Sequence, residues 1–318
     1  MNGGRFGYAT EEVTCYLCGS EKSILLFTGE DDLTGIPGQF PYVKCMSCGL
    51  VYQNPRVTIE DVKQFYTDRY LAHRRHQKWG LLTPLFNRAM ETLDRKKIGI
   101  VERYAELTSD SKVMDVGCAV GTFLLMLQKK YGCAISGVDF IDTSYYPGFS
   151  EIDFYLGLFY KKELPLNHYD LITMWHFLEH DFDPRKSLQQ ARMCLKDSGH
   201  LIIEVPRLDS LTYRVFGSRW PGAQAPQHTV LYSKRHFLAI VQAEGFEVID
   251  YLAYGAFPAY FYIATGIAFQ FLKGRGLTLD KYILPYFLGQ LLLAPILAFG
   301  NCLNLAMQTL ILRKRQGE

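Results

Sequence analysis

Two pairs of cysteines give the clearest chemical signal in the chain. Cys15 and Cys18 form one C-x-x-C pair, Cys45 and Cys48 form a second, and a glycine follows each pair. Two intervening residues let both thiolates of a pair reach one ion, and two pairs complete a tetrahedral four-thiolate site. We predict a structural zinc ion in a ribbon domain, because four thiolates leave no open position for a substrate. Two disulfides or redox-active pairs are the alternatives.

A stretch with the pattern of strand, turn and helix, KVMDVGCAVGTFLLML at 112–127, could bind a ligand. Its β-branched run stops at Gly117, Gly121 follows, and an apolar helical pattern then begins. Glycine lets the backbone approach a ligand closely, and the start of a helix directs free N–H groups toward it. The spacing G-x-x-x-G differs from the G-x-G-x-x-G of dinucleotide-binding proteins, and no Gly-Lys-Ser/Thr of a phosphate loop is present.

Two carboxylates follow the predicted strands of this region. Asp139 ends the second strand, about twenty residues beyond the glycine turn. At the carboxyl edge of a doubly wound sheet, such an acid accepts hydrogen bonds from ribose hydroxyls. Asp115, at the end of the first strand, can orient the glycine turn or meet a ligand amine.

These segments resemble the class I S-adenosylmethionine (SAM) methyltransferases, in which D-x-G-C-x-x-G and G-V-D occur in this order. The resemblance continues through 169–180 and 199–206, which correspond to the fourth and fifth strands. It implies an α/β fold, a Rossmann-like doubly wound sheet of seven strands with an antiparallel last strand. It also implies SAM as the cofactor, bound by Asp115, Gly117, Cys118, Ala119, Gly121, Asp139, Phe140, Leu158 and Trp175. A Rossmann-like domain that binds another ligand is the alternative.

Adenine recognition departs from the pattern of the resembled family. Many relatives carry an acidic residue after the third strand, where it holds the adenine amine. The matching stretch here is Gly157-Leu158-Phe159, which has no carboxylate. We therefore expect backbone groups and apolar contact from Leu158 to take this role.

Histidines supply the candidate catalytic groups. His176, Glu179 and His180 have the spacing H-x-x-E-H, which also matches an inverted zincin metal motif. That motif needs a long helix, whereas Asp183-Pro184 interrupts the pattern, and L-E-H-x-x-D-P is common after the fourth strand in the resembled family. We predict His180 and His228 as catalytic, since a neutral imidazole can act as a general base. A hydrogen bond from His180 to backbone is the structural alternative.

The pattern divides the chain into a zinc-ribbon domain at 1–56 and a methyltransferase domain at 57–318. A proline at 55 and neighbouring polar residues interrupt the pattern at the boundary. The segment 65–70 resembles one that packs over the cofactor mouth in relatives with this ribbon, which implies a site role for Tyr66 and Tyr70. Packing of the ribbon on the main domain explains these aromatic residues equally well.

The C-terminal region is unusually apolar, because 255–272 and 282–312 contain no charged residue. Length alone would permit a transmembrane helix, but Pro285, Pro295 and several polar or glycine residues divide the second run. The resembled fold also needs a final strand, for which Met307–Leu312 is suited. We expect an apolar helical insertion at 255–305 that does not span a membrane. It would cap the active site, contact a membrane surface peripherally, or form a homodimer face.

Composition limits the function classes further. The chain has 318 residues and a formal net charge of +2, so nothing marks it as a nucleic-acid-binding protein. The first residues contain no apolar run of a signal peptide, and we expect a cytoplasmic protein, with peripheral contact at the inner face of a membrane as the alternative. We predict methyl transfer to a small-molecule acceptor, with a sugar or glycan precursor favoured by the resemblance. A lipid or quinone methyltransferase and a non-catalytic scaffold with a SAM fold are the alternatives.

Overall fold

A seven-stranded sheet forms the centre of the computed structural model, which describes residues 7–66, 83–272, 275–277, 286, 288–294 and 303–316. The strand order is β12–β13–β10–β9–β6–β7–β8. The strands are β6 (Lys112–Val116), β7 (Ala134–Asp139), β8 (Asp153–Leu156), β9 (Tyr169–Trp175), β10 (Leu195–Pro206), β12 (Phe246–Leu252) and β13 (Met307–Lys314). The predicted doubly wound α/β fold is confirmed.

The last strand returns into the sheet and does not add to its edge. β13 pairs antiparallel with β10 on one side and with β12 on the other, with Leu201 opposite Leu312 and Phe246 opposite Lys314. Leu310, Ile311 and Leu312 are fully buried, as expected for a strand covered on both faces. The predicted final strand is therefore confirmed, and it runs two residues further than the apolar run 307–312 suggested.

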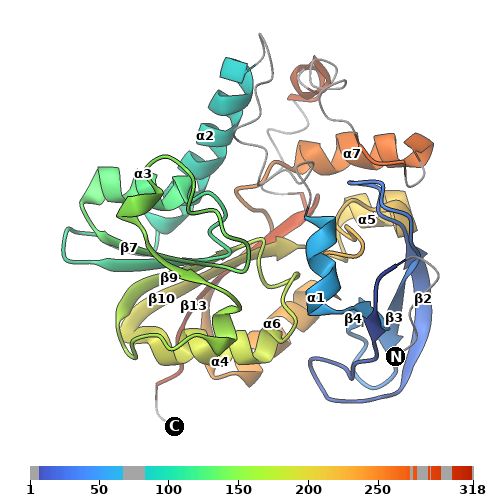
Figure 1. The fold of residues 1–318 in the computed structure, drawn as a ribbon, viewed down its shortest axis with the longest axis horizontal. Helices are drawn as coiled ribbons and strands as arrows, with labels where there is room; N and C mark the ends of the chain where they lie inside the picture. Colours follow the sequence, from blue (N-terminus) through green and yellow to red (C-terminus); the bar gives the residue numbers. More distant parts are fainter. Residues whose placement is uncertain are drawn as a thin grey trace.

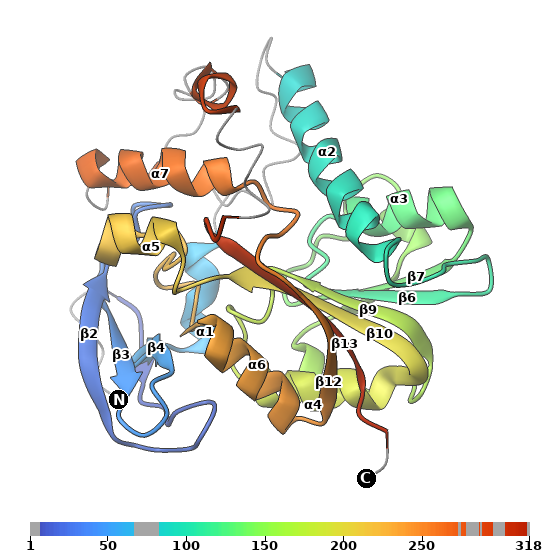
Figure 2. The same ribbon diagram turned by 180° about the vertical axis from the view of Figure 1, so that it is seen from behind.

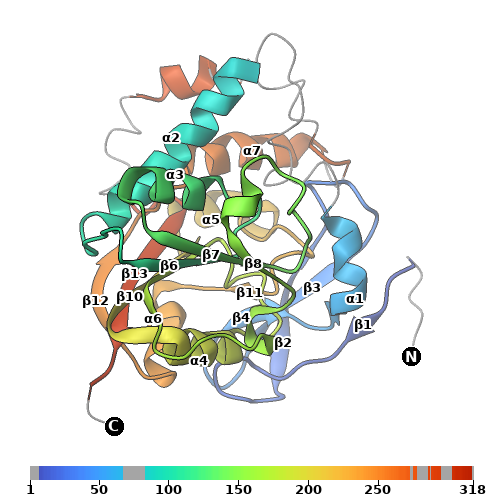
Figure 3. The ribbon, with the colours of Figure 1, turned by 60° about the vertical axis from the view of Figure 1, so that its left-hand side comes forward.

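Helices cover both faces of the sheet (Figures 1 and 3). α2 (Thr83–Val101) and α3 (Thr122–Tyr131) lie on one face, and α4 (Pro184–Cys194) and α6 (Lys234–Ala243) lie on the other. α4 and α6 begin at side-chain caps, where Asp183 accepts from the Lys186 N–H and Ser233 from the His236 N–H. Short helices complete this part: α5 (Leu211–Phe216) and the 3₁₀ turns Phe149–Glu151, Phe159–Lys161 and Gly217–Arg219.

The N-terminal part is a second, smaller sheet that the main part completes. β2 (Ser23–Gly29), β3 (Phe40–Cys45) and β4 (Val51–Gln53) form an antiparallel sheet, and β11 (Val230–Leu231) pairs with β4 (Figure 3). Outside this sheet, β1 (Thr10–Glu11) pairs with β5 (Arg56–Val57), followed by α1 (Ile59–Val62) and the 3₁₀ turn Lys63–Phe65. No pattern in the sequence predicted β11, and the domain boundary at 56 stays a prediction.

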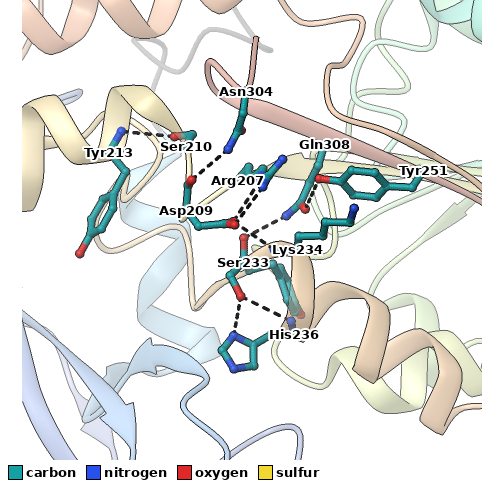
Figure 4. Close-up of polar contacts among 11 residues, drawn as sticks. Arg207, Asp209, Ser210, Tyr213, Ser233, Lys234, His236, Tyr251, Asn304 and Gln308 are labelled. Carbon is teal, nitrogen blue, oxygen red and sulfur yellow. Dashed lines mark hydrogen bonds and ion pairs between the residues drawn. The ribbon is translucent and has the colours of Figure 1, made fainter. Parts of the chain in front are cut away.

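A polar network fixes both ends of the segment that runs from β10 to α6 (Figure 4). The Arg207 guanidinium donates to both carboxylate oxygens of Asp209 at 3.0 and 2.9 Å, and the Lys234 N–H donates to the same carboxylate at 3.1 Å. The Asn304 side chain donates to the Asp209 carbonyl oxygen, and the Gln308 side chain donates to that of Tyr232, each at 2.9 Å. The network therefore anchors a segment that contains His228 to the start of β13.

The apolar insertion contributes α7 (Ala259–Leu272), which lies alongside α5 in both Figures 1 and 2. Among the residues that the structure describes, no helix is long and apolar enough to cross a membrane. Much of the predicted insertion beyond α7, at 273–274, 278–285, 287 and 295–302, lies outside the described residues, as does Tyr70.

Candidate active site and zinc centre

The four predicted zinc ligands converge. The Sγ atoms of Cys15 and Cys48 lie 3.4 Å apart, and those of Cys18 and Cys45 lie 3.6 Å apart. Zn–S bonds of about 2.3 Å in a tetrahedron require sulfur separations of about 3.8 Å, whereas a disulfide requires about 2.05 Å. The geometry therefore fits a structural zinc ion and excludes disulfides within this cluster.

Local backbone geometry explains how each cysteine pair forms a metal-binding turn. The glycines that follow the pairs, Gly19 and Gly49, have φ values of +71° and +88°, which residues with a Cβ rarely adopt. Their N–H groups donate to the carbonyl oxygens of Cys15 and Cys45 at 2.8 and 3.0 Å. Burial opposes ionisation of the Cys45 thiol, but hydrogen bonds from the Cys48 and Ser47 N–H groups and from neighbouring thiols lower its pKa to about 6.

A cavity of about 230 Å³ opens at the carboxyl ends of β6, β7 and β9. This is where a doubly wound sheet binds its ligand. Of the nine residues predicted to bind the cofactor, eight line this cavity: Asp115, Gly117, Cys118, Ala119, Asp139, Phe140, Leu158 and Trp175. The ninth, Gly121, does not line it.

The two turn glycines have different roles. Gly117, with a φ of +77°, lines the cavity. Gly121 is the N-cap of α3 with a φ of +70°, and a Cβ there would lie 2.3 Å from Cδ1 of Ile152. Gly121 is therefore required by its backbone conformation and by packing, and its contact with a cofactor stays a prediction.

Asp139 organises the turn that it faces. Its carboxylate accepts the N–H groups of Ala119 at 2.9 Å and of Ile141 at 3.0 Å. Ala119 has a φ of +45°, and its carbonyl oxygen accepts a hydrogen bond from the Thr143 hydroxyl at 2.6 Å. Burial raises the pKa of Asp139 to about 6. Each carboxylate oxygen keeps a further lone pair, so ribose hydroxyls could still donate to it.

Charged residues from α2 reach the same cavity, and the sequence reasoning missed them. Asp94 and Lys97 both line it, with the Lys97 ammonium 3.8 Å from the Asp94 carboxylate and 5.7 Å from the centre of the Trp175 ring. Asp115 lies nearby, accepts the Thr173 hydroxyl at 2.6 Å, and has its pKa raised to about 7 by burial. The sequence feature that could have indicated Asp94 and Lys97 is a pair of opposite charges three residues apart within an apolar helical pattern.

The two predicted catalytic histidines come together in the wall of the same cavity, in a region called the histidine end below. The rings of His180 and His228 have centres 4.4 Å apart and are nearly perpendicular, and both line the cavity. Nδ1 of His180 lies 3.0 Å from the Gln227 carbonyl oxygen, and Nδ1 of His228 lies 2.8 Å from that of Gly222. A carbonyl oxygen only accepts, so each Nδ1 carries the proton. Burial lowers the pKa of both histidines, which keeps the imidazoles neutral.

His176 does not join these histidines but bridges two buried glutamates. Its Nε2 lies 3.1 Å from Glu204, and its Nδ1 lies 3.3 Å from Glu179. Burial opposes protonation of this ring, but the two carboxylates outweigh burial and raise the pKa of His176 to about 9. Its φ of +56° is unusual for a residue with a Cβ, and such strain clusters at functional sites. Glu204, inside β10, gave no signal in the sequence.

The insertion covers one side of the cavity. Phe257, Phe261 and Tyr262 line it from this direction, and Glu204 fixes the approach to α7 by accepting the N–H groups of Ala256 and Phe257. Tyr66 also lines the cavity, with its hydroxyl 3.0 Å from Nδ1 of His180.

Arg219 joins the covering helix to the ribbon. Its guanidinium pairs with Glu30 at 3.0 Å and Asp32 at 2.9 Å, and it donates to the carbonyl oxygen of Phe269 in α7 at 3.3 Å. Both the ribbon and the insertion therefore contribute to the wall of the site.

Comparison with protein families decides the classification. The model of a methyltransferase domain matches residues 73–251, more than half of the chain. The chain belongs to the SAM-dependent methyltransferases. No curated protein matches this methyltransferase.

Solved structures resemble this methyltransferase in fold. A chain of the Haloferax volcanii complex that contains the Trm112 methyltransferase activator has 12% sequence identity and a TM-score of 0.50, covering 79% of this chain and 97% of that one. Geranyl diphosphate C-methyltransferase from Streptomyces coelicolor has 11% identity and a TM-score of 0.49, with coverage of 72% and 80%. Phosphoethanolamine N-methyltransferase 2 from Haemonchus contortus, solved with SAM, has 15% identity and a TM-score of 0.48. That match covers 70% of this chain and spans about half, 53%, of the Haemonchus chain.

Replacement of one ribbon ligand should remove one zinc equivalent. We expect Cys48→Ser to lose about one zinc per chain in elemental analysis and to expose the N-terminal part to limited proteolysis, because the ion holds the two turns together. Cys133→Ser is the matched control, since Cys133 is a buried free thiol outside the cluster. Equal zinc contents in the two variants would contradict the assignment.

Removal of the Asp139 carboxylate should weaken SAM binding. The carboxylate is expected to accept the two ribose hydroxyls and also orders the Ala119 turn, so Asp139→Ala should reduce the binding free energy by about 2 to 4 kcal/mol. Isothermal titration calorimetry measures this change. Asp142→Ala, at an exposed neighbouring carboxylate, should leave affinity unchanged. The assignment fails if both variants bind SAM as the unmodified protein does.

SAM affinity should rise with pH through about 6. Burial raises the pKa of Asp139 to about 6, and the ionised carboxylate accepts hydrogen bonds from two ribose hydroxyls more strongly than the protonated acid does. Binding at lower pH must therefore displace a proton or lose part of this interaction. Calorimetry between about pH 5 and pH 8 should show the affinity falling on acidification. Asp139→Asn, which does not titrate, should show a flatter profile. An affinity that increases on acidification would contradict this role for Asp139.

Proposed function

We propose that this protein transfers the methyl group of SAM to an oxygen or carbon atom of a small-molecule acceptor, with a sugar or glycan precursor as the first candidate. The supporting observation is that one cavity joins the glycine turn and Asp139 to the paired imidazoles of His180 and His228. The polar side chains Asp181 and Gln224 also line the histidine end, which suits an acceptor with several hydroxyls. Acceptor and methyl donor could therefore meet inside one cavity.

The cofactor pose follows from charge and hydrogen-bonding capacity. We place the SAM carboxylate near the Gly117 turn and the Lys97 ammonium, and the ribose on Asp139. Adenine would lie against Leu158 and Phe140, in keeping with the absence of a carboxylate after β8. The methyl group would then face the histidine end of the cavity.

Methyl transfer from a sulfonium is an in-line displacement, so the protein acts mainly by positioning the two reactants. A bond forms from the acceptor atom to the methyl carbon, and the electron pair of the carbon–sulfur bond returns to sulfur, leaving S-adenosylhomocysteine. An acceptor hydroxyl or C–H must also lose a proton. The lone pairs of neutral His180 and His228 are suited to hold such a group or to assist its deprotonation.

A second candidate is a lipid or quinone methyltransferase. Phe257, Phe261 and Tyr262 line one wall of the cavity and would contact an apolar acceptor. The third candidate, a non-catalytic scaffold with a SAM fold, is disfavoured by the complete cofactor end, where Gly117 and Asp139 retain open access to the cavity.

We also propose the domain division at 56/57 and a peripheral contact of the insertion with the inner face of a membrane. Apolar side chains in and after α7 are exposed, with Phe271 and Leu292 each 81% exposed. Exposed apolar groups of this kind suit a lipid surface or a second copy of the chain.

A methyl-transfer screen tests the function. Protein and methyl-labelled SAM are incubated with nucleotide sugars or with lipid extracts, and label in product identifies the acceptor class. With that acceptor, His180→Ala and His228→Ala should lower kcat by about 10²- to 10⁴-fold and leave SAM affinity near that of the unmodified chain. His168→Ala, at the opposite end of β9, is the control and should retain activity. Equal activity in all three variants would remove the two histidines from the reaction.

Extraction of native membranes tests the peripheral contact. Alkaline carbonate or high salt should release the protein, because no described helix is long and apolar enough to span the bilayer. Phe271→Ser should shift the chain toward the soluble fraction, whereas Leu166→Ser, at an exposed leucine far from the insertion, should not. Release only by detergent would overturn the peripheral interpretation, and recovery as a soluble dimer would favour the homodimer face.

A further inference from the structure

The three residues of the H-x-x-E-H spacing do not form a metal-binding group in the structure. The fold instead brings Glu179 and His180 together with His228. His176 lies between Glu179 and Glu204, and His228, not His176, joins Glu179 and His180 in a group with metal-ligand spacing. One ligand atom from each of Glu179, His180 and His228 lies within 4.8 Å of the others. The three residues come from two segments about fifty residues apart, so no local motif could have revealed the group.

Backbone hydrogen bonds hold these two segments together. The Thr229 N–H donates to the carbonyl oxygen of Glu179 at 2.7 Å, and Nδ1–H of His180 donates to that of Gln227 at 3.0 Å. His228 lies between these two anchor points. The juxtaposition of the three side chains is thus fixed by main-chain contacts on both sides.

The environment of the Glu179 carboxylate favours a bound cation at this site. The Glu179 side chain is 1% exposed, and among the described residues neither carboxylate oxygen has a hydrogen-bond partner. In the described structure His176 lies 3.3 Å from this carboxylate, and the same ring is shared with Glu204. A buried carboxylate without hydrogen bonds is costly unless a positive charge compensates it.

The surrounding charges add to this excess of negative charge. Asp181 is also buried and lines the same end of the cavity. Arg56, whose guanidinium donates to the Phe182 carbonyl oxygen at 2.7 Å, is already paired with Glu11 at 2.8 Å. Within the described part of the chain, Glu179, Asp181 and Glu204 are therefore three buried carboxylates in this region, and His176 contacts two of them.

The two imidazoles have the hydrogen-bonding pattern of metal ligands. Both His180 and His228 direct Nδ1–H to a backbone carbonyl oxygen, which leaves the lone pair of each Nε2 unprotonated. Metal-binding histidines commonly use their other N–H in this way, because the contact fixes both tautomer and ring orientation.

We propose that Glu179, His180 and His228 bind a divalent transition-metal ion, of the zinc class, at the acceptor end of the cavity. Two imidazoles and one carboxylate are a ligand set that suits zinc and its first-row neighbours. Glu179 lies beneath the cavity while both histidines line it, so the open coordination position faces the acceptor. This ion is additional to the one in the four-cysteine ribbon.

The metal site also indicates the chemical class of the acceptor, an inference that rests on the proposed function. An acceptor oxygen, either a hydroxyl or an enol, binds the open position, and the ion lowers its pKa. The oxygen loses its proton to water, because the lone pairs of His180 and His228 bind the ion in this arrangement and do not act as bases. Either this oxygen or the carbon of the enolate then forms a bond to the methyl carbon, and the carbon–sulfur electron pair goes to sulfur. The ion is neither oxidised nor reduced.

Metal stoichiometry of the full-length chain tests the site without any acceptor. After equilibration with zinc and removal of loosely bound metal, we expect about two zinc ions per chain, one from the ribbon and one from this site. Glu179→Gln and His228→Gln should each retain only the ribbon equivalent. His168→Gln, at a histidine outside the cavity, should retain both. SAM affinity close to that of the unmodified chain shows that each variant is folded.

Cobalt distinguishes the two kinds of site. Co²⁺ added to protein whose ribbon already holds zinc should give visible d–d absorption without the charge-transfer band of thiolate ligands, and both variants should lack this signal. A single zinc per chain in the unmodified protein, or a second equivalent that persists in both variants, would overturn the proposal. A chain with one zinc that still methylates an acceptor would leave the proposed function intact, and a two-zinc chain inactive in the screen would leave the metal site intact.

Discussion

The extended strip from Gln227 to Leu231 is the constraint on which the site depends, because it forms backbone hydrogen bonds on both of its edges. On one edge, β11 pairs with β4, and the Gln53 N–H donates to the Thr229 carbonyl oxygen at 2.8 Å. On the other edge, the Thr229 N–H reaches the loop after β9. The hydroxyl of Tyr42, in the ribbon, lies 2.7 Å from the His228 carbonyl oxygen. The cysteine ribbon is thus a structural support of the histidine pair.

Polarity within the cavity changes from one end to the other. The cofactor end combines carboxylates of raised pKa with the Lys97 ammonium, which suits a ligand that carries both an ammonium and a carboxylate. The other end combines neutral imidazoles with a partly buried His176 whose ring bridges Glu179 and Glu204. Because Glu204 also accepts the N–H groups before α7, the buried charges of this end fix the covering helix as well.

The sequence predicted those features that depend on local pattern. The strand–turn–helix unit, the acid after β7, the cysteine pairs and the final strand each arise from residues that are close in sequence. In contrast, the pairing of β11 with β4 of the ribbon involves only Val230 and Leu231 of β11. Two residues are too few to form a recognisable strand pattern. Asp94 and Lys97 were not predicted as site residues, because a helical pattern does not indicate which of its charged residues will line a cavity.

Tertiary contacts also decided the role of His176. Its spacing to Glu179 and His180 suggested a shared helical face, but the chain turns after β9 and the three residues do not lie on one helix. His176 has a left-handed backbone conformation, and its side chain contacts Glu204 of β10. Buried charge pairing between separate strands leaves no periodic signal, so the sequence could not reveal this contact.

Because β13 lies between β10 and β12, the insertion that connects β12 to β13 is a loop that starts and ends in the sheet. Its two ends leave and re-enter at neighbouring strands, so the sheet fixes the distance between them irrespective of what the intervening chain does. The entropic cost of closing such a loop grows only with the logarithm of its length. Residues 253–306 can therefore lengthen, shorten or change composition during evolution at little cost to the fold. Phe261 and Tyr262 of this insertion line the cavity. Changes in the insertion can therefore alter which acceptor the cavity admits while the rest of the cavity wall and the ribbon stay the same.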